Sequence, residues 1–203
     1  NSDNLVSEEK LNKARTCELA EWENCGDANS EYVLSYDVAR EEGNINALSA
    51  LVVIKITPRN NGTYIKEVVN IFTMEGTHDT VQAKFIKQKV REYQPRIVVI
   101  DANGLGSGVT DQLVLRLDDG NPPYAVVNND KYDVYKQEDS LPILFALKAQ
   151  EKETKNEDMI NRFMNMFNRL DVSLLCNANN GIKAIEKQQK RKIKDSEEIS
   201  NLQ

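Results

Sequence analysis

Histidine and cysteine are scarce in this 203-residue sequence, which has one histidine and three cysteines. A metal site built mainly from histidines is therefore excluded, as is a Ser-His-Asp triad unless His78 takes part in it. Cys17, Cys25 and Cys176 show neither a CxxC pair nor zinc-ligand spacing. Their odd number and scatter indicate free thiols in a reducing compartment.

Long apolar runs are also lacking. The longest apolar-rich run, Ala47–Ile54, is much shorter than the roughly 20 residues that a membrane-spanning helix needs. The N-terminus has no basic region followed by an apolar one, so we expect neither a signal peptide nor a membrane partner. The first residue is Asn1 rather than Met, and on this ground we expect a fragment of a longer protein.

The chain lacks the basic excess that is usual in nucleic-acid-binding proteins. It has 26 basic and 32 acidic residues, a formal charge of -6. The charge is uneven, because residues 183–194 hold six basic residues and only one acidic residue, Glu186. This basic run either contacts a DNA backbone or forms a solvated helix face, and the sequence leaves both interpretations open.

The first half of the chain has the pattern of three strands. Residues 32–39 alternate with a period of two, and residues 47–57 and 63–74 are rich in β-branched and apolar side chains. Residues 58–62 end in Asn-Gly, which is typical of a hairpin loop because these residues tolerate positive φ. Such short connections predict an antiparallel meander.

The pattern then changes to alternating helices and strands. Thr80–Tyr93 has one apolar stripe at helical spacing, and Arg96–Asp101 is a short apolar strand of the kind buried on both faces. Residues 24–30 read as a turn-rich linker, so we expect a leading helix and linker over 1–30 and the main domain over 31–203. We further predict a strand at 124–128, an edge strand at 172–176, and helices at 4–22, 110–117, 140–150, 156–170 and 181–202.

This order predicts an α/β fold of the ribonuclease-H-like class. Its mixed sheet would begin with an antiparallel three-strand meander, continue with parallel strands and be flanked by helices. In that topology the fourth strand lies beside the first and runs parallel to it.

This predicted topology would bring two aspartates together at the ends of neighbouring strands. Asp37 ends the first predicted strand and Asp101 ends the fourth. Adjacent strands lie about 4.8 Å apart, and two carboxylates that close repel each other unless a cation lies between them. Mg²⁺ and Mn²⁺ prefer oxygen ligands of this kind, and two such ions support phosphodiester hydrolysis. The alternative is that each aspartate only makes a turn at its strand end.

A glycine-rich turn, residues 104–108, follows the second aspartate. Its GxGxG spacing fits neither a Walker motif nor the GxGxxG fingerprint. It either lets backbone N–H groups approach a phosphate or is a tight strand-to-helix turn. We expect His78 to lie in a loop and to take no part in catalysis.

Three segments resemble the nuclease half of bacteriophage terminase large subunits. They are residues 5–16 (LVSEEKLNKART), 32–40 (YVLSYDVAR) and 98–108 (VVIDANGLGSG), and the resemblance extends to about residue 150. It implies a metal-dependent endonuclease domain of a DNA-packaging terminase, with Asp37 and Asp101 as catalytic residues and ligands of a two-metal Mg²⁺ or Mn²⁺ site. It also implies that the domain cuts concatemeric double-stranded DNA. The expected partners are that DNA, a portal ring and a terminase small subunit, in the host cell cytoplasm during virion assembly.

The sequence departs from the family pattern in its further acids. The family's third acid lies near the C-terminal end, where only Asp195 resembles it loosely. Residues 41–46 carry asparagines where the family often has an acidic pair. We therefore expect the third ligand to lie beyond Gln203 and the domain to be truncated at its C-terminus. Two alternatives stay open: a DNA- or portal-docking module without full catalytic equipment, and another ribonuclease-H-like nuclease such as a resolvase.

Overall fold

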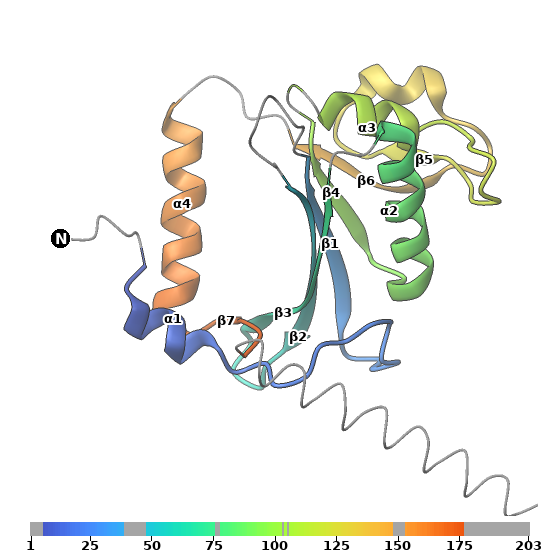
Figure 1. Cartoon of the computed structure of the whole chain (residues 1–203). Helices are drawn as coiled ribbons and strands as arrows, with labels where there is room; N and C mark the ends of the chain where they lie inside the picture. Colours follow the sequence, from blue (N-terminus) through green and yellow to red (C-terminus); the bar gives the residue numbers. More distant parts are fainter. Residues whose placement is uncertain are drawn as a thin grey trace, which may run out of the picture.

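A mixed seven-stranded sheet forms the centre of the molecule (Figure 1). The computed structural model describes residues 6–38, 48–75, 78–102, 104, 106–147 and 153–176. The strands lie in the order β5-β6-β4-β1-β2-β3-β7. This mixed sheet flanked by helices confirms the predicted fold class.

The antiparallel meander lies at the middle of the sheet. It consists of β1 (Glu31–Asp37), β2 (Leu48–Pro58) and β3 (Tyr64–Glu75). The predicted hairpin loop joins β2 to β3, where Gly62 has φ 79° and the Arg59 backbone N–H donates to the Thr63 carbonyl over 2.8 Å. Asn-Gly suits this turn because glycine adopts positive φ without steric cost.

Three parallel strands extend the sheet from the other side of β1. β4 (Ile97–Asp101) pairs in parallel with β1, as predicted, and with β6 (Leu141–Leu147), which pairs in turn with β5 (Tyr124–Val126). A 3-10 helix, η1 (Asp130–Tyr135), lies in the connection between β5 and β6.

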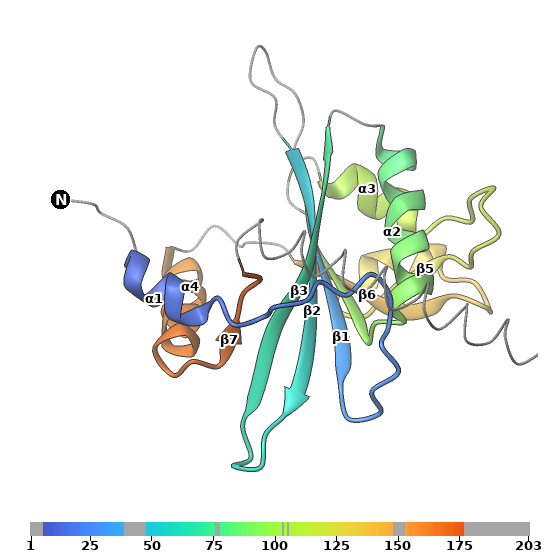
Figure 2. The same ribbon diagram turned by 60° about the horizontal axis from the view of Figure 1, so that its bottom comes forward.

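The main core lies between this sheet and two helices, α2 (Asp79–Tyr93) and α3 (Gly106–Leu113), which Figures 1 and 2 place on the same side of the strands. Alternate residues of β1, β2 and β4 face it, among them Leu34, Leu51, Val98 and Ile100, each fully buried. The period of two therefore separates a buried face from a second, partly exposed face.

The helix expected at 140–150 is wrong, because Leu141–Leu147 forms strand β6. A short continuous apolar run fits a buried strand and a buried helix equally well. The strand is the form that hydrogen-bonds to β4 on one side and β5 on the other. The helix predicted at 110–117 is present but begins earlier, at Gly106.

The leading helix is shorter than the expected 4–22. α1 covers only Glu8–Ala14, with the Ser7 side chain accepting the Lys10 N–H at its N-terminus. Beyond it the chain is no longer helical, and the Cys17 N–H donates to the Leu174 carbonyl while the Glu21 N–H donates to the Val69 carbonyl. These bonds to distant strands replace the helical bonds that the local pattern predicts. The boundary expected at residue 30 remains a prediction.

A second, smaller core joins the two ends of the described chain beside β3. α1 packs against α4 (Glu153–Asn168) and β7 (Val172–Ser173), with Ala14, Phe167 and Val172 buried between them. Both views place α1 and α4 together, on the opposite side of the sheet from α2 (Figure 2). The edge strand predicted at 172–176 is present but shorter, as β7, which pairs in parallel with β3. The helix expected at 181–202 lies outside the described residues.

Among the described helices, none is both long and apolar enough to cross a membrane.

Candidate metal centre

Asp37 and Asp101 lie side by side at the carboxyl ends of two parallel strands. The last pair in register between β1 and β4 is Tyr36 with Ile100, and each aspartate is the next residue of its strand. Tyr36 and Ile100 point into the buried core. Since side chains alternate along a strand, both aspartates point to the opposite face of the sheet. Asp37 is exposed and Asp101 is half-buried.

A buried polar network supports β1 directly beneath Asp37. The Tyr36 hydroxyl donates to Gln82 Oε1 over 2.6 Å, and the Ser49 hydroxyl donates to the same oxygen over 3.2 Å. All three side chains are at most 2% exposed. Burial, with a further contribution from nearby Asp79, raises the pKa of Tyr36, so its hydroxyl stays a hydrogen-bond donor. The network ties the end of β1 to α2 and β2.

The first residue of α3 supports Asp101 from its backbone side. A Cβ added to Gly106 would lie 1.6 Å from the carbonyl oxygen of Asp101, a distance that no side chain tolerates. The Thr110 hydroxyl donates to the Gly106 carbonyl over 2.7 Å and is itself fully buried. Gly106 therefore lets the helix pack directly on the end of β4. This contact favours the interpretation of residues 104–108 as a tight strand-to-helix turn.

No third acid joins the two aspartates in the part of the chain that the structure describes. Within it, no group of three or more histidine, cysteine, aspartate or glutamate side chains could hold a metal ion. Residues 41–46, Asp195 and the basic run 183–194, on which several expectations depend, lie outside the described residues. His78 is exposed and immediately precedes α2, with no side-chain hydrogen bond to the end of that helix.

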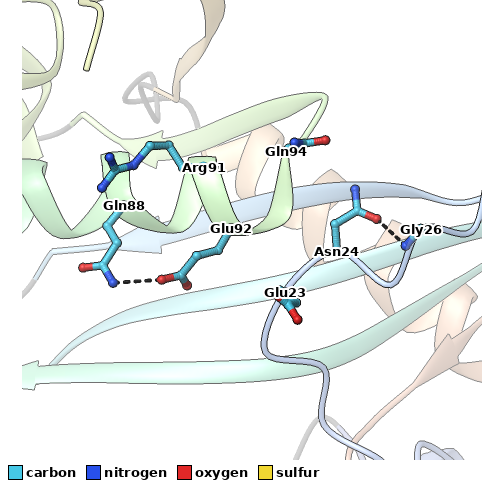
Figure 3. Close-up of a pocket in the computed structure, with 7 residues that line it drawn as sticks. All are labelled: Glu23, Asn24, Gly26, Gln88, Arg91, Glu92 and Gln94. Atoms are coloured by element: carbon cyan, nitrogen blue, oxygen red, sulfur yellow. Dashed lines mark hydrogen bonds between the residues drawn. The ribbon is translucent and has the colours of Figure 1, made fainter. Parts of the chain in front are cut away.

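A pocket on the described surface lies at the other end of the sheet from the aspartates. Its volume is about 680 Å³, and the residues that line it come from the loop before β1 and from the last turns of α2 (Figure 3). Asn24 fixes this loop to the helix, because its backbone N–H donates to the Glu92 carbonyl and its side-chain amide donates to the Tyr93 carbonyl. Since α2 ends just before β4 begins, the pocket is remote from Asp101 and offers no ligands to a metal there.

Comparisons with known proteins find similarity in structure only. No family model matches the sequence, and no curated protein sequence matches it. The chain is similar to the large terminase nuclease from thermophilic phage G20c with bound magnesium, at 13% identity and a TM-score of 0.48. That match covers 77% of this chain and 63% of the other, so this chain spans less than two thirds of its length. The cobalt-bound form of the same nuclease matches at 14% identity and a TM-score of 0.44, covering 87% of this chain and 77% of that one.

The sequence placed both aspartates at strand ends, and the structure brings those ends together. The sequence did not identify Gln82 or Ser49 as supporting residues, whereas Gly106 lies in the glycine-rich turn that was interpreted in one of two ways as a tight strand-to-helix turn. Gln82 lies on the buried face of α2, and a glutamine among apolar positions of a helical stripe is a signal that could have identified it.

Proposed function

We propose that this chain is a metal-dependent endonuclease domain of the terminase large-subunit type, with Asp37 and Asp101 as its catalytic metal ligands. The observation that carries the proposal is the parallel pairing of β1 and β4, which ends with these two carboxylates adjacent and on one face. The resemblance of residues 32–40 and 98–108 to the two acidic motifs of terminase nucleases supports the same assignment.

The carboxylates fit a hard divalent cation. Their oxygens are the ligands that Mg²⁺ and Mn²⁺ prefer, and a cation between them relieves the repulsion of two adjacent negative charges. When bound, such ions activate a water molecule and stabilise the leaving oxygen of a phosphodiester. The protein's own part is to hold the two carboxylates in place, through the Tyr36–Gln82 bond on one strand and the Gly106 contact on the other.

The substrate and partners of the proposal follow from the terminase resemblance. The domain would cut concatemeric double-stranded DNA in the host cell cytoplasm, within a packaging machine that includes a portal ring and a terminase small subunit. Residues 31–203 would form the nuclease domain proper.

Mn²⁺-dependent nicking of supercoiled plasmid tests the proposal. Asp37→Asn and Asp101→Asn should each reduce the nicking rate at least a hundredfold, because each removes a metal ligand and with it charge stabilisation in the transition state. Asp158→Asn is the matched control, since Asp158 is exposed on α4, and its rate should equal that of the wild type. Nicking that persists at the wild-type rate in either strand-end variant would overturn the assignment.

A second candidate function is a docking module that binds DNA or the portal ring without cutting. The absence of a third acid near Asp37 and Asp101 among the described residues favours it. In that case plasmid would be bound but not nicked at any Mn²⁺ concentration.

A further inference from the structure

Four titratable side chains meet at the opposite end of β1 from the candidate metal centre. They are Glu21 and Cys25 from the segment before β1, Tyr32 from β1 and Lys55 from β2. Lys55 pairs with Tyr32 in the sheet. Tyr32 lies five residues before Asp37 on β1. At about 3.3 Å per residue, the two sites lie roughly 17 Å apart, so this cluster plays no part in the proposed nuclease chemistry.

The lysine is the centre of the cluster. Its Nζ lies 2.9 Å from Glu21 Oε1 and 3.1 Å from Cys25 Sγ. The Tyr32 hydroxyl donates to the second Glu21 oxygen and accepts the Cys25 backbone N–H over 3.1 Å. The side chains of Lys55 and Glu21 are 13% and 19% exposed. Cys25 itself is exposed, so its sulfur is held against an ammonium group and yet is open to solvent.

These contacts favour the thiolate form of Cys25. Burial acts to raise the pKa of the thiol, but hydrogen bonds to the sulfur, among them those from the Asp27 backbone and from Lys55, outweigh it and hold the pKa below its usual value. Burial acts to lower the pKa of Lys55, and its contacts with Glu21 and Cys25 raise it overall. The lysine therefore stays charged beside the sulfur across the neutral range.

The other two cysteines have different surroundings. Cys17 is buried, its thiol donates to the Leu19 carbonyl, and burial raises its pKa to about 11. Cys176 is half-buried, and its thiol donates to the Arg15 carbonyl over 3.3 Å. Neither sulfur has a described hydrogen bond from a cationic side chain. A reactive thiolate requires a positive and partly exposed environment, and among the three thiols only that of Cys25 has one.

We propose that Cys25 is a modification site, at which the sulfur held by Lys55 reacts with small electrophiles and hydroperoxides. With hydrogen peroxide, the thiolate sulfur attacks one peroxide oxygen and the O–O bond breaks. The second oxygen leaves as hydroxide and takes up a proton to become water. The sulfur is oxidised by two electrons to a sulfenic acid as the peroxide is reduced, and an added thiol reverses the change.

Peptide mapping after limited alkylation of the folded chain with iodoacetamide tests the proposal. Cys25 should be labelled first at pH 7, and its rate should reach half its maximum below pH 8.5, about the usual value for a free thiol. Dilute hydrogen peroxide should add one oxygen to the same residue, and a thiol should remove it. Labelling of Cys176 as fast as Cys25 would overturn the proposal.

Two substitutions with opposite expected effects test the role of the cluster. Lys55→Met should slow Cys25 alkylation at pH 7 roughly tenfold, because loss of the ammonium group raises the pKa of the thiol and lowers the thiolate fraction. Glu21→Gln should speed it, because the Glu21 charge raises the pKa of Cys25. Lys66→Met is the matched control on β3, where Lys66 bonds the Tyr64 carbonyl, and should change nothing.

Circular dichroism verifies the fold of each variant. If Lys55→Met does not fold, Glu21→Gln still decides the question, since an unchanged or slower rate in that folded variant overturns the proposal.

Discussion

Gly106 has no room for a side chain. An alanine there would place its Cβ 1.6 Å from the Asp101 carbonyl oxygen and 2.7 Å from the carbonyl carbon. Because both atoms belong to the backbone, α3 or the end of β4 must move. We expect Gly106→Ala to lower the free energy of unfolding by about 3 kcal/mol, as overpacking in a core does, measured by equilibrium urea unfolding.

Ser107→Ala is the control for this prediction. Ser107 lies next to Gly106 and is partly exposed, and its hydroxyl donates to the Gly104 carbonyl over 2.7 Å. Its loss should cost about 1 kcal/mol or less. Equal stability of the two variants would mean that the close approach of α3 to Asp101 is not a real constraint.

Single residues were predictable where a local pattern marks them. Asp37 and Asp101 stand at the ends of apolar strands, so the sequence predicted their positions, and the parallel pairing of β1 with β4 brings those strand ends together. Gln82 and Gly106 act through contacts with residues 46 and 5 positions away along the chain. No local pattern encodes the partner of a buried glutamine, so the role of Gln82 required the structure, whereas the glycine-rich turn around Gly106 was visible in the sequence.

One arginine reinforces the attachment of β7 to the β2–β3 hairpin, in addition to the parallel pairing of β7 with β3. Arg59 Nη1 donates to Asp171 Oδ1 over 2.8 Å, and Nη2 donates to the Leu170 carbonyl over 2.7 Å. Asp171 is 9% exposed, so removing its partner leaves a nearly buried carboxylate unpaired. We expect Arg59→Met to lower the free energy of unfolding by about 2 kcal/mol and to speed amide hydrogen exchange in β7.

Lys13→Met provides a comparison, since the ion pair of Lys13 with Glu9 on α1 is largely exposed. It should change stability less than Arg59→Met does and leave β7 exchange as it was. Unaltered β7 exchange in Arg59→Met would show that the parallel pairing with β3 suffices without the arginine.

Elements with a clear periodicity were predicted well, and those decided by distant partners were not. The meander, α2 and β4 follow from alternation and from one apolar stripe. Leu141–Leu147 has no period that separates helix from strand, and pairing on both sides decides it. Residues 15–22 continue a helical pattern, but their backbone groups bond Val69 and Leu174 instead. Tertiary contacts outweigh a weak local preference in both cases.

The charge of the whole molecule bears on how it would bind DNA. A chain with a net charge of -6 has little general attraction for phosphates, so we expect the basic run 183–194 to supply much of it. Neutralising Lys187, Lys190, Arg191 and Lys194 together should weaken DNA binding and flatten its salt dependence. For every phosphate that the variant no longer neutralises, the slope of log affinity against log salt should become shallower by roughly 0.9.

The control for this measurement removes the same number of charges elsewhere. It neutralises four exposed lysines of α1 and the η1 region, namely Lys10, Lys13, Lys131 and Lys136. If both variants flatten the slope equally, binding follows net charge alone and the basic run has no special part.

The claim that Asp37 and Asp101 form a metal centre is tested most directly by anomalous scattering from crystals soaked in Mn²⁺. We predict a peak about 2–2.5 Å from carboxylate oxygens of both residues, and its loss in Asp37→Asn and Asp101→Asn crystals that retain the fold. A peak that lies away from both carboxylates, or that persists unchanged in the two variants, would contradict the claim.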